Sequence, residues 1–102
     1  MNIKLSYLYR DGANYKQFNE EIFSNRNHLE LGYIDEEIRK CLIDGEWFYV
    51  DQWGLKYMHV HPWDNEIDHT WHEFDSVEEI NEKPTTAVDI SELLAKIMAI
   101  KL

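Results

Sequence analysis

Apolar and polar residues alternate at the beginning of the chain, as they do in a half-buried strand. In residues 2–9 the apolar side chains fall mainly on every second position, so one face of an extended segment collects them. Residues 10–14 are rich in turn formers and residues 18–23 are again typical of a strand, which predicts an antiparallel hairpin. Further strand candidates are residues 46–53, 57–60 and 70–74.

Residues 33–43 change to the spacing of an amphipathic helix. The apolar residues of this segment fall on one stripe, which includes Cys41. Three acids, Asp35–Glu37, occupy the predicted first turn, where the helix dipole favours negative charge. Gly45 follows as the predicted stop. We interpret Cys41 as a core residue and not as a nucleophile, because it shares the apolar stripe.

The last segment has the clearest helical pattern. Asp89 can act as N-cap, and Glu92 three positions later completes a capping-box pattern. The apolar stripe then continues from Ile90 to Leu102, which predicts a helix docked on the sheet. Residues 75–88 contain Pro84 and many acids, and we expect them to form a long surface connection.

Together these segments predict a single α+β domain over residues 1–102. It consists of an antiparallel sheet of about four strands, one helix after the first hairpin and a C-terminal helix packed on the sheet. A chain of 102 residues with 44% apolar residues can build a core without covalent staples. The single cysteine favours a reducing compartment, and we see neither a signal peptide nor a membrane span, so we expect a cytoplasmic protein.

The chain is strongly acidic, with 20 acids against 10 bases and a formal charge of −10. Phosphate-rich partners need clustered cations, so we expect direct binding neither to nucleic acid nor to a membrane. Electrostatic steering favours a basic protein surface as partner instead. The alternative left open is that the acidity only keeps a small protein in solution.

Residues 57–82 concentrate this charge, because they contain eight carboxylates and neither Lys nor Arg. Tryptophans in and beside this stretch either pack under their own loop or form an exposed binding patch, since aromatic residues dominate interface energetics. The predicted partner-binding residues are Trp63, Asp64, Glu66, Asp68, Trp71, Glu73, Asp75, Glu78, Glu79 and Glu82.

Four histidines form a candidate metal site: His59, His61, His69 and His72. The spacing of His59, His61 and Glu66 matches the first metal motif of cupins, but the flanking glycines and the second motif are missing. On a strand, His69 and His72 would point to opposite faces. We therefore expect no bound metal or other cofactor, and interpret the cluster as a polar histidine-rich loop or a pH-responsive surface.

No catalytic signature supports an enzyme. The sequence contains no Gly-rich phosphate loop, no nucleophile elbow and no suitably spaced Cys/His pair. The hypothesis is therefore a non-enzymatic interaction module, such as an inhibitor or immunity-type protein that covers a basic surface by mimicking nucleic acid. The alternative is a small metal-binding protein or metalloenzyme that uses the four histidines. A third reading is an accessory protein whose acidity is incidental.

Four stretches of the chain, taken together, can be compared with known sequences. They are residues 9–16 (YRDGANYK), 43–48 (IDGEWF), 52–55 (QWGL) and 68–74 (DHTWHEF). They resemble a family of short uncharacterised bacterial and phage proteins of about this length. The resemblance implies a single-domain bacterial or phage protein, and it implies no activity or ligand.

Overall fold

A four-stranded antiparallel sheet and three helices make up the described part of the chain, residues 1–10, 16–56 and 71–100 of a computed structural model. In chain order they are β1 (Asn2–Arg10), β2 (Lys16–Phe23), α1 (Leu31–Lys40), β3 (Trp47–Tyr49), α2 (Val50–Trp53), β4 (Trp71–Ile80) and α3 (Ile90–Met98). The strand order is β2-β1-β4-β3. The predicted α+β class is confirmed, including the helix after the first hairpin and the C-terminal helix.

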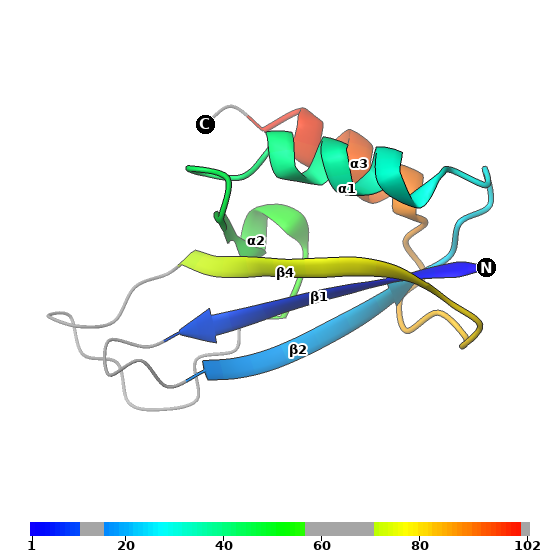
Figure 1. The fold of residues 1–102 in the computed structure, drawn as a ribbon, viewed down its shortest axis with the longest axis horizontal. Coiled ribbons are helices and arrows are strands. Elements are labelled where there is room, and N and C mark those ends of the chain that lie inside the picture. The colour runs from blue at the N-terminus through cyan, green and yellow to red at the C-terminus, as the bar shows by residue number, and fades with distance from the viewer. Residues whose placement is uncertain (11–15, 57–70, 101–102) are drawn as a thin grey trace, which may run out of the picture.

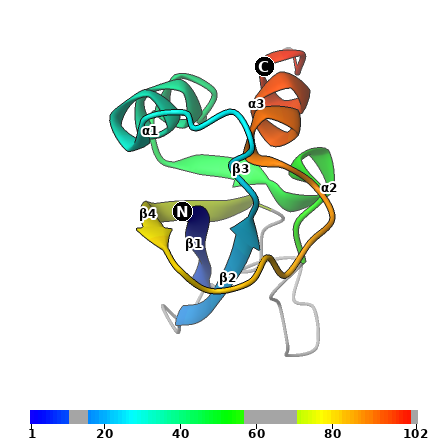
Figure 2. The same ribbon diagram turned by 90° about the vertical axis from the view of Figure 1, so that its right-hand side faces the viewer.

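The helices cover one face of the sheet only. Figures 1 and 2 show α1 and α3 above the sheet, side by side in Figure 2, with α2 between α3 and the sheet. The opposite face carries none of the described helices. This division into a covered and an uncovered face decides which side chains are available to other molecules.

The core lies between the covered face and the helices. The alternation predicted for the first strand puts Ile3, Leu5 and Tyr7 on this face, and all three are fully buried. Their neighbours in the core come from every other element: Phe23, Ile34, Ile38, Leu42, Phe48, Val50, Trp53, Leu55, Phe74, Ile90, Leu93, Leu94 and Ile97. Cys41 packs against this cluster, and burial raises the pKa of its thiol, as suits a core residue.

Strand β4 is longer than the sequence pattern predicts. We expected a strand only as far as Phe74, followed by a surface connection, but β4 continues to Ile80. The register against β1 shifts after Tyr7↔Phe74, and the next pair is Ser6↔Ser76. Asp75 is thus the extra residue of a β-bulge, which interrupts the period of two and hides the strand in the sequence.

The aromatic content of residues 46–53 predicts a single strand, and this prediction is wrong. Strand β3 ends at Tyr49, and the chain then turns into the short helix α2. Val50 and Trp53 are three positions apart on one side of this turn, and both are buried in the core. Helical spacing here brings both side chains inward, whereas a strand would point them to opposite faces.

Helix α1 begins and ends earlier than predicted. It covers Leu31–Lys40, so Asp35–Glu37 lie in its middle and not in its first turn. There the acids form surface ion pairs, from Asp35 to Arg39 and from Glu37 to Lys40. Gly45 is not directly at the helix end, but its φ of 72° and that of Asp44 (52°) make the turn before β3. The strand predicted at residues 57–60 lies outside the described residues.

The N-terminus of α3 is held by the buried carboxylate of Asp89. The predicted capping box is confirmed, since Asp89 accepts from the backbone N–H of Ser91 and Glu92 accepts from that of Asp89. Asp89 also accepts hydrogen bonds from the Ser24 hydroxyl at 2.7 Å and from the Arg26 backbone N–H at 2.9 Å. One carboxylate therefore joins α3 to the segment that leaves β2.

Hydrogen bonds determine the charge state of this buried group. Burial alone would raise the pKa of Asp89, but the hydrogen bonds from Ser91, Arg26 and Ser24 outweigh it and hold the pKa well below its usual range. The folded protein thus keeps Asp89 ionised even in weak acid.

Packing of α3 should be visible in stability. Leu94 is 4% exposed and Met98, on the same helix, is 51% exposed. We expect Leu94→Ala to lower the free energy of unfolding by about 2–5 kcal/mol, because it removes buried methyl groups and leaves a cavity. Met98→Ala is the matched control and should change it by less than about 0.5 kcal/mol in urea titrations. Equal effects of the two variants would contradict the packing described.

The low pKa of Asp89 gives stability a defined pH dependence. The contribution of the ionised Asp89 carboxylate to the free energy of unfolding is complete above the unfolded-state pKa of about 4. It is lost as the pH falls toward the folded-state pKa. We expect the difference in free energy of unfolding between wild type and Asp89→Asn to be largest at neutral pH and to shrink below about pH 4. Denaturant titrations from neutral to acid pH measure it. A difference independent of pH would show that the ionised carboxylate is not what stabilises the cap.

Candidate protein-interaction surface

Three aromatic side chains gather on the uncovered face of the sheet, at the β3 edge: Trp71 is exposed, and Trp47 and Tyr49 are half-buried. Trp71 of β4 is 39% exposed and pairs directly with Tyr49 of β3, while Trp47 pairs with Glu73. Directly paired residues share a face. Phe48 between them points into the core, so Trp47 and Tyr49 share the uncovered face with Trp71.

We call Trp47, Tyr49 and Trp71 the aromatic patch. The Trp47 and Trp71 rings are tilted toward one another, with their centroids 6.4 Å apart. Together with Ile43 and Asp44, the patch lines a surface hollow of about 220 Å³. Large rings beside a hollow can anchor an apolar side chain of another protein, which is what interface hot spots do.

The carboxylates of β4 are spread along the strand, with Glu73 next to the patch and Glu78 near the other end, and the register of the sheet neutralises these two. Arg10 of β1 donates to Glu73 at 2.8 Å, and Lys4 contacts Glu78 at 2.6 Å. The hydrogen bond to Glu78 raises the pKa of Lys4, as the one to Glu73 raises that of Arg10. Strand β4 contains no Lys or Arg of its own, but in the fold its acids therefore lie against the bases of β1.

Three acids near β4 remain uncompensated. Asp75, Glu79 and Glu82 are exposed and form no ion pair with any side chain in the described ranges. Asp75 is the bulged residue and accepts a hydrogen bond from the Ser76 hydroxyl. These three side chains carry the negative charge that β4 and the segment after it offer to a partner.

The predicted partner residues are thus only partly brought together. Trp71, Glu73, Asp75 and Glu78 line the exterior of β4, whereas Glu79 pairs with the inward-facing Ile3 and Glu82 follows the strand. The predicted residues Trp63, Asp64, Glu66 and Asp68 lie outside the described part of the chain, as do His59, His61 and His69. Sequence reasoning missed Trp47 and Tyr49, although their spacing of two places them on one face.

His72 belongs to the core. It is fully buried on the covered face, where its ring centroid lies 4.9 Å from that of Tyr9, 5.9 Å from that of Tyr7 and 6.2 Å from that of Phe48. The Tyr7 hydroxyl donates to the Lys56 carbonyl and accepts from Asn19. Within the described residues, no three His, Cys, Asp or Glu side chains are grouped so that they could hold a metal ion.

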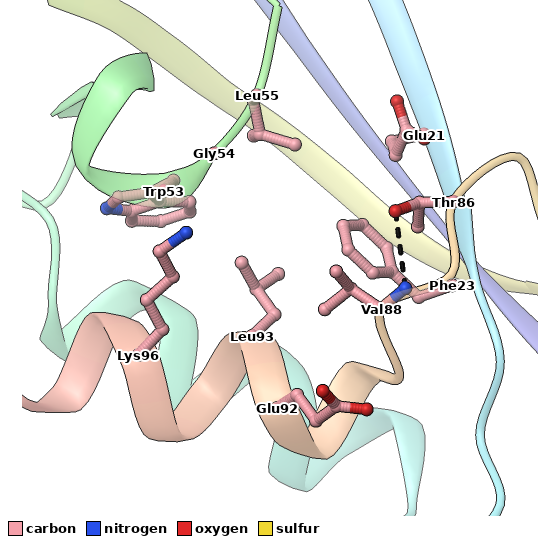
Figure 3. Close-up of a pocket in the computed structure, with 10 residues that line it drawn as sticks. All are labelled: Glu21, Phe23, Trp53, Gly54, Leu55, Thr86, Val88, Glu92, Leu93 and Lys96. Atoms are coloured by element: carbon pink, nitrogen blue, oxygen red, sulfur yellow. Dashed lines mark hydrogen bonds between the residues drawn. The ribbon is translucent and has the colours of Figure 1, made fainter.

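A second hollow of about 250 Å³ lies on the helical side, between α2, α3 and β2 (Figure 3). Phe23, Trp53 and Leu93 form apolar walls, and Lys96 extends toward Trp53 and Gly54. Gly54 ends α2 with φ of 71°, and a Cβ there would lie 2.9 Å from Lys96 Nζ, so only glycine fits without a shift.

This second hollow makes a poor reaction centre. Its rim acids are already engaged, because Glu21 accepts from the Thr85 hydroxyl and Glu92 pairs with Arg26 at 2.8 Å. The aromatic patch is therefore the better candidate for a functional surface.

No known family model, curated protein or solved structure matches this chain. The resemblance of the four sequence stretches to short bacterial and phage proteins therefore stays a prediction. Among the described residues, no helix is both long and apolar enough to cross a bilayer.

The metal hypothesis has a simple test. We expect protein purified without added metal to contain less than about 0.1 equivalents of zinc, iron or manganese by elemental analysis, because His72 is enclosed by aromatic rings and no three potential ligands are grouped in the part of the chain that the structure describes. A stoichiometric metal that disappears in the double variant His59→Ala, His61→Ala would contradict this expectation.

Proposed function

We propose that this protein is a non-enzymatic interaction module that binds a basic partner protein through the aromatic patch and the acids of β4 and the segment after it. The observation that carries the proposal is the aromatic patch, an exposed Trp71 beside the half-buried Trp47 and Tyr49, on a sheet face that the described helices leave uncovered. Interface energy concentrates in a few large aromatic side chains surrounded by polar ones. Trp47, Tyr49 and Trp71 have this arrangement, with Glu73 paired directly with Trp47.

The acids and the rings have different tasks in this proposal. A formal charge of −10 attracts a basic partner from a distance, which raises the association rate and makes it sensitive to salt. The uncompensated acids Asp75, Glu79 and Glu82 direct that attraction toward β4. Desolvation of the rings then slows dissociation. The ion-paired Glu73 and Glu78 contribute less, since their charge is already screened by Arg10 and Lys4.

The proposed class of partner is a protein whose basic surface otherwise contacts nucleic acid. Such a surface presents clustered Lys and Arg side chains, which are complementary to exposed carboxylates. An inhibitor or immunity-type protein would cover it and compete with phosphates. A single cysteine suits action in the reducing cytoplasm. The metal-binding alternative receives less support, because His72, one of its four ligands, is part of the aromatic core.

Paired variants test the surface after a basic partner has been captured from a lysate of the host and purified. Trp71→Ala should raise the dissociation rate about tenfold or more, as loss of a hot spot does. Tyr33→Ala is the control, because Tyr33 is 46% exposed on α1, on the other side of the sheet. Surface plasmon resonance measures both rates. If the two variants bind alike, the surface is misplaced.

Charge variants test the role of the acids separately. The triple variant Asp75→Asn, Glu79→Gln, Glu82→Gln should slow association and reduce its dependence on salt. The control triple Glu30→Gln, Glu36→Gln, Asp51→Asn removes the same net charge from exposed positions in and beside the helices. Equal slowing in both triples would mean that only total charge matters, and absence of any basic partner would contradict the proposed function.

A further inference from the structure

Among the described residues, strand β2 leaves one edge of the sheet partly unpaired. It is the first strand in the order β2-β1-β4-β3, so one side of its backbone faces away from the sheet. Near its end this edge is occupied, because Thr85 donates its N–H to the Ile22 carbonyl at 2.9 Å and accepts the Ile22 N–H on its hydroxyl at 2.7 Å. The other sheet edge is closed at Trp47, which exchanges backbone hydrogen bonds with Ile43.

The contacts of Ile22 fix which backbone groups of β2 point outward. In an antiparallel pair, successive residues alternate between groups that bond the neighbouring strand and groups that point away from it. The register between β1 and β2 is continuous, with Lys4↔Ile22, Ser6↔Glu20, Leu8↔Phe18 and Arg10↔Lys16. Glu20, Phe18 and Lys16 therefore direct their N–H and C=O groups outward, as Ile22 does. Unlike Ile22, they form no outward backbone bond to the described residues.

The side chains of these three residues are exposed on the uncovered face. Phe18 is 60% exposed, a large value for an apolar ring on a strand, and it is flanked by Lys16 and Glu20. Glu20 lies 3.5 Å from Lys4, but Lys4 has its closer contact with Glu78 at 2.6 Å. An open edge with an exposed ring at its centre is a template for pairing with another strand.

The order of these three side chains is self-complementary. Consider β2 pairing antiparallel with β2 of a second copy, with Phe18 opposite Phe18 of the partner subunit. Lys16 then lies opposite Glu20 of the partner subunit, and Glu20 lies opposite Lys16 of the partner subunit. Both opposite-charge pairs and the ring pair are favourable cross-strand neighbours. The outward backbone groups of all three residues then face one another and can exchange N–H···O bonds.

We propose that this protein forms a twofold-symmetric homodimer by antiparallel pairing of the β2 edges, centred on Phe18. The two sheets become one continuous sheet, and the contact ends where Thr85 occupies the edge at Ile22. The aromatic patch is at the opposite end of the strand order, so it stays exposed in both copies. The dimer is independent of the proposed function, but it would present that surface twice.

Complementary charge reversals test this pairing. In a homodimer of the Lys16→Glu variant an acid lies opposite an acid, and in a homodimer of Glu20→Lys a base lies opposite a base. The dissociation constant of each variant homodimer should therefore be about tenfold or more above that of wild type. An equimolar mixture of the two variants restores opposite charges in both pairs and should dimerise again. Sedimentation equilibrium from roughly 1 µM to roughly 1 mM covers the affinities of small interfaces. We expect wild type to approach twice the 12.3 kDa of one chain.

Cross-linking tests the register. In a hydrogen-bonded antiparallel pair the Cα atoms are about 5.5 Å apart, within the span of a disulfide. In a Cys41→Ser background, Phe18→Cys should therefore link to itself across the twofold axis under mild oxidation. Lys16→Cys is the matched control and should link far less, because it faces Glu20 of the partner subunit. Circular dichroism confirms that each variant is folded.

These experiments can overturn the dimer without touching the proposed function. A wild type that stays monomeric throughout the concentration range contradicts it. So does a dimer that survives either charge reversal, fails to re-form in the mixture, or cross-links through Lys16→Cys as readily as through Phe18→Cys. Partner binding at the aromatic patch is measured separately, by the Trp71→Ala and Tyr33→Ala pair.

Discussion

A buried carboxylate, that of Asp89, organises the contact between the helices and the sheet. An ionised group in the interior is costly unless hydrogen bonds replace its water. Here Ser24 and Arg26, which follow β2, and Ser91, in the first turn of α3, supply them. The charge can be satisfied only when both segments are in place, so the same bonds fix where α3 begins and against which strand end it lies.

The position of α3 determines which parts of the sheet remain available. Together with α1, α3 covers the face of the sheet that carries Ile3, Leu5 and Phe74, which explains why apolar side chains of the central strands are buried on this face. The other face keeps the ion pairs from Lys4 and Arg10 to β4 and, at its two sides, exposed rings. The rings near β3 belong to the aromatic patch, and Phe18 belongs to the β2 edge. The two proposed contacts of this protein are therefore on different parts of one uncovered face.

Local patterns sufficed to predict the elements in which one periodicity is uninterrupted. The first strand and the capping box of Asp89 and Glu92 are examples, since each depends on neighbours in sequence. The bulge at Asp75 and the helical turn after Tyr49 break the period of two, and only packing against β1 and the core reveals them. For the candidate surface, Trp71 was predicted, but its partner Trp47 comes from another strand. The ion pair between Glu78 and Lys4 likewise depends on the register of β1 against β4, which cannot be inferred from composition.

Asp89 fixes the helical layer to one face of the sheet. Residue-resolved amide hydrogen exchange at neutral pH tests it most directly, since protected amides report the free energy of the opening that exposes them. We predict that the amides of Arg26 and Ser91, both bonded to Asp89, exchange only with global unfolding, like those of central strand β1. Exchange of these two amides at the rate of a frayed loop, while β1 stays protected, would contradict it.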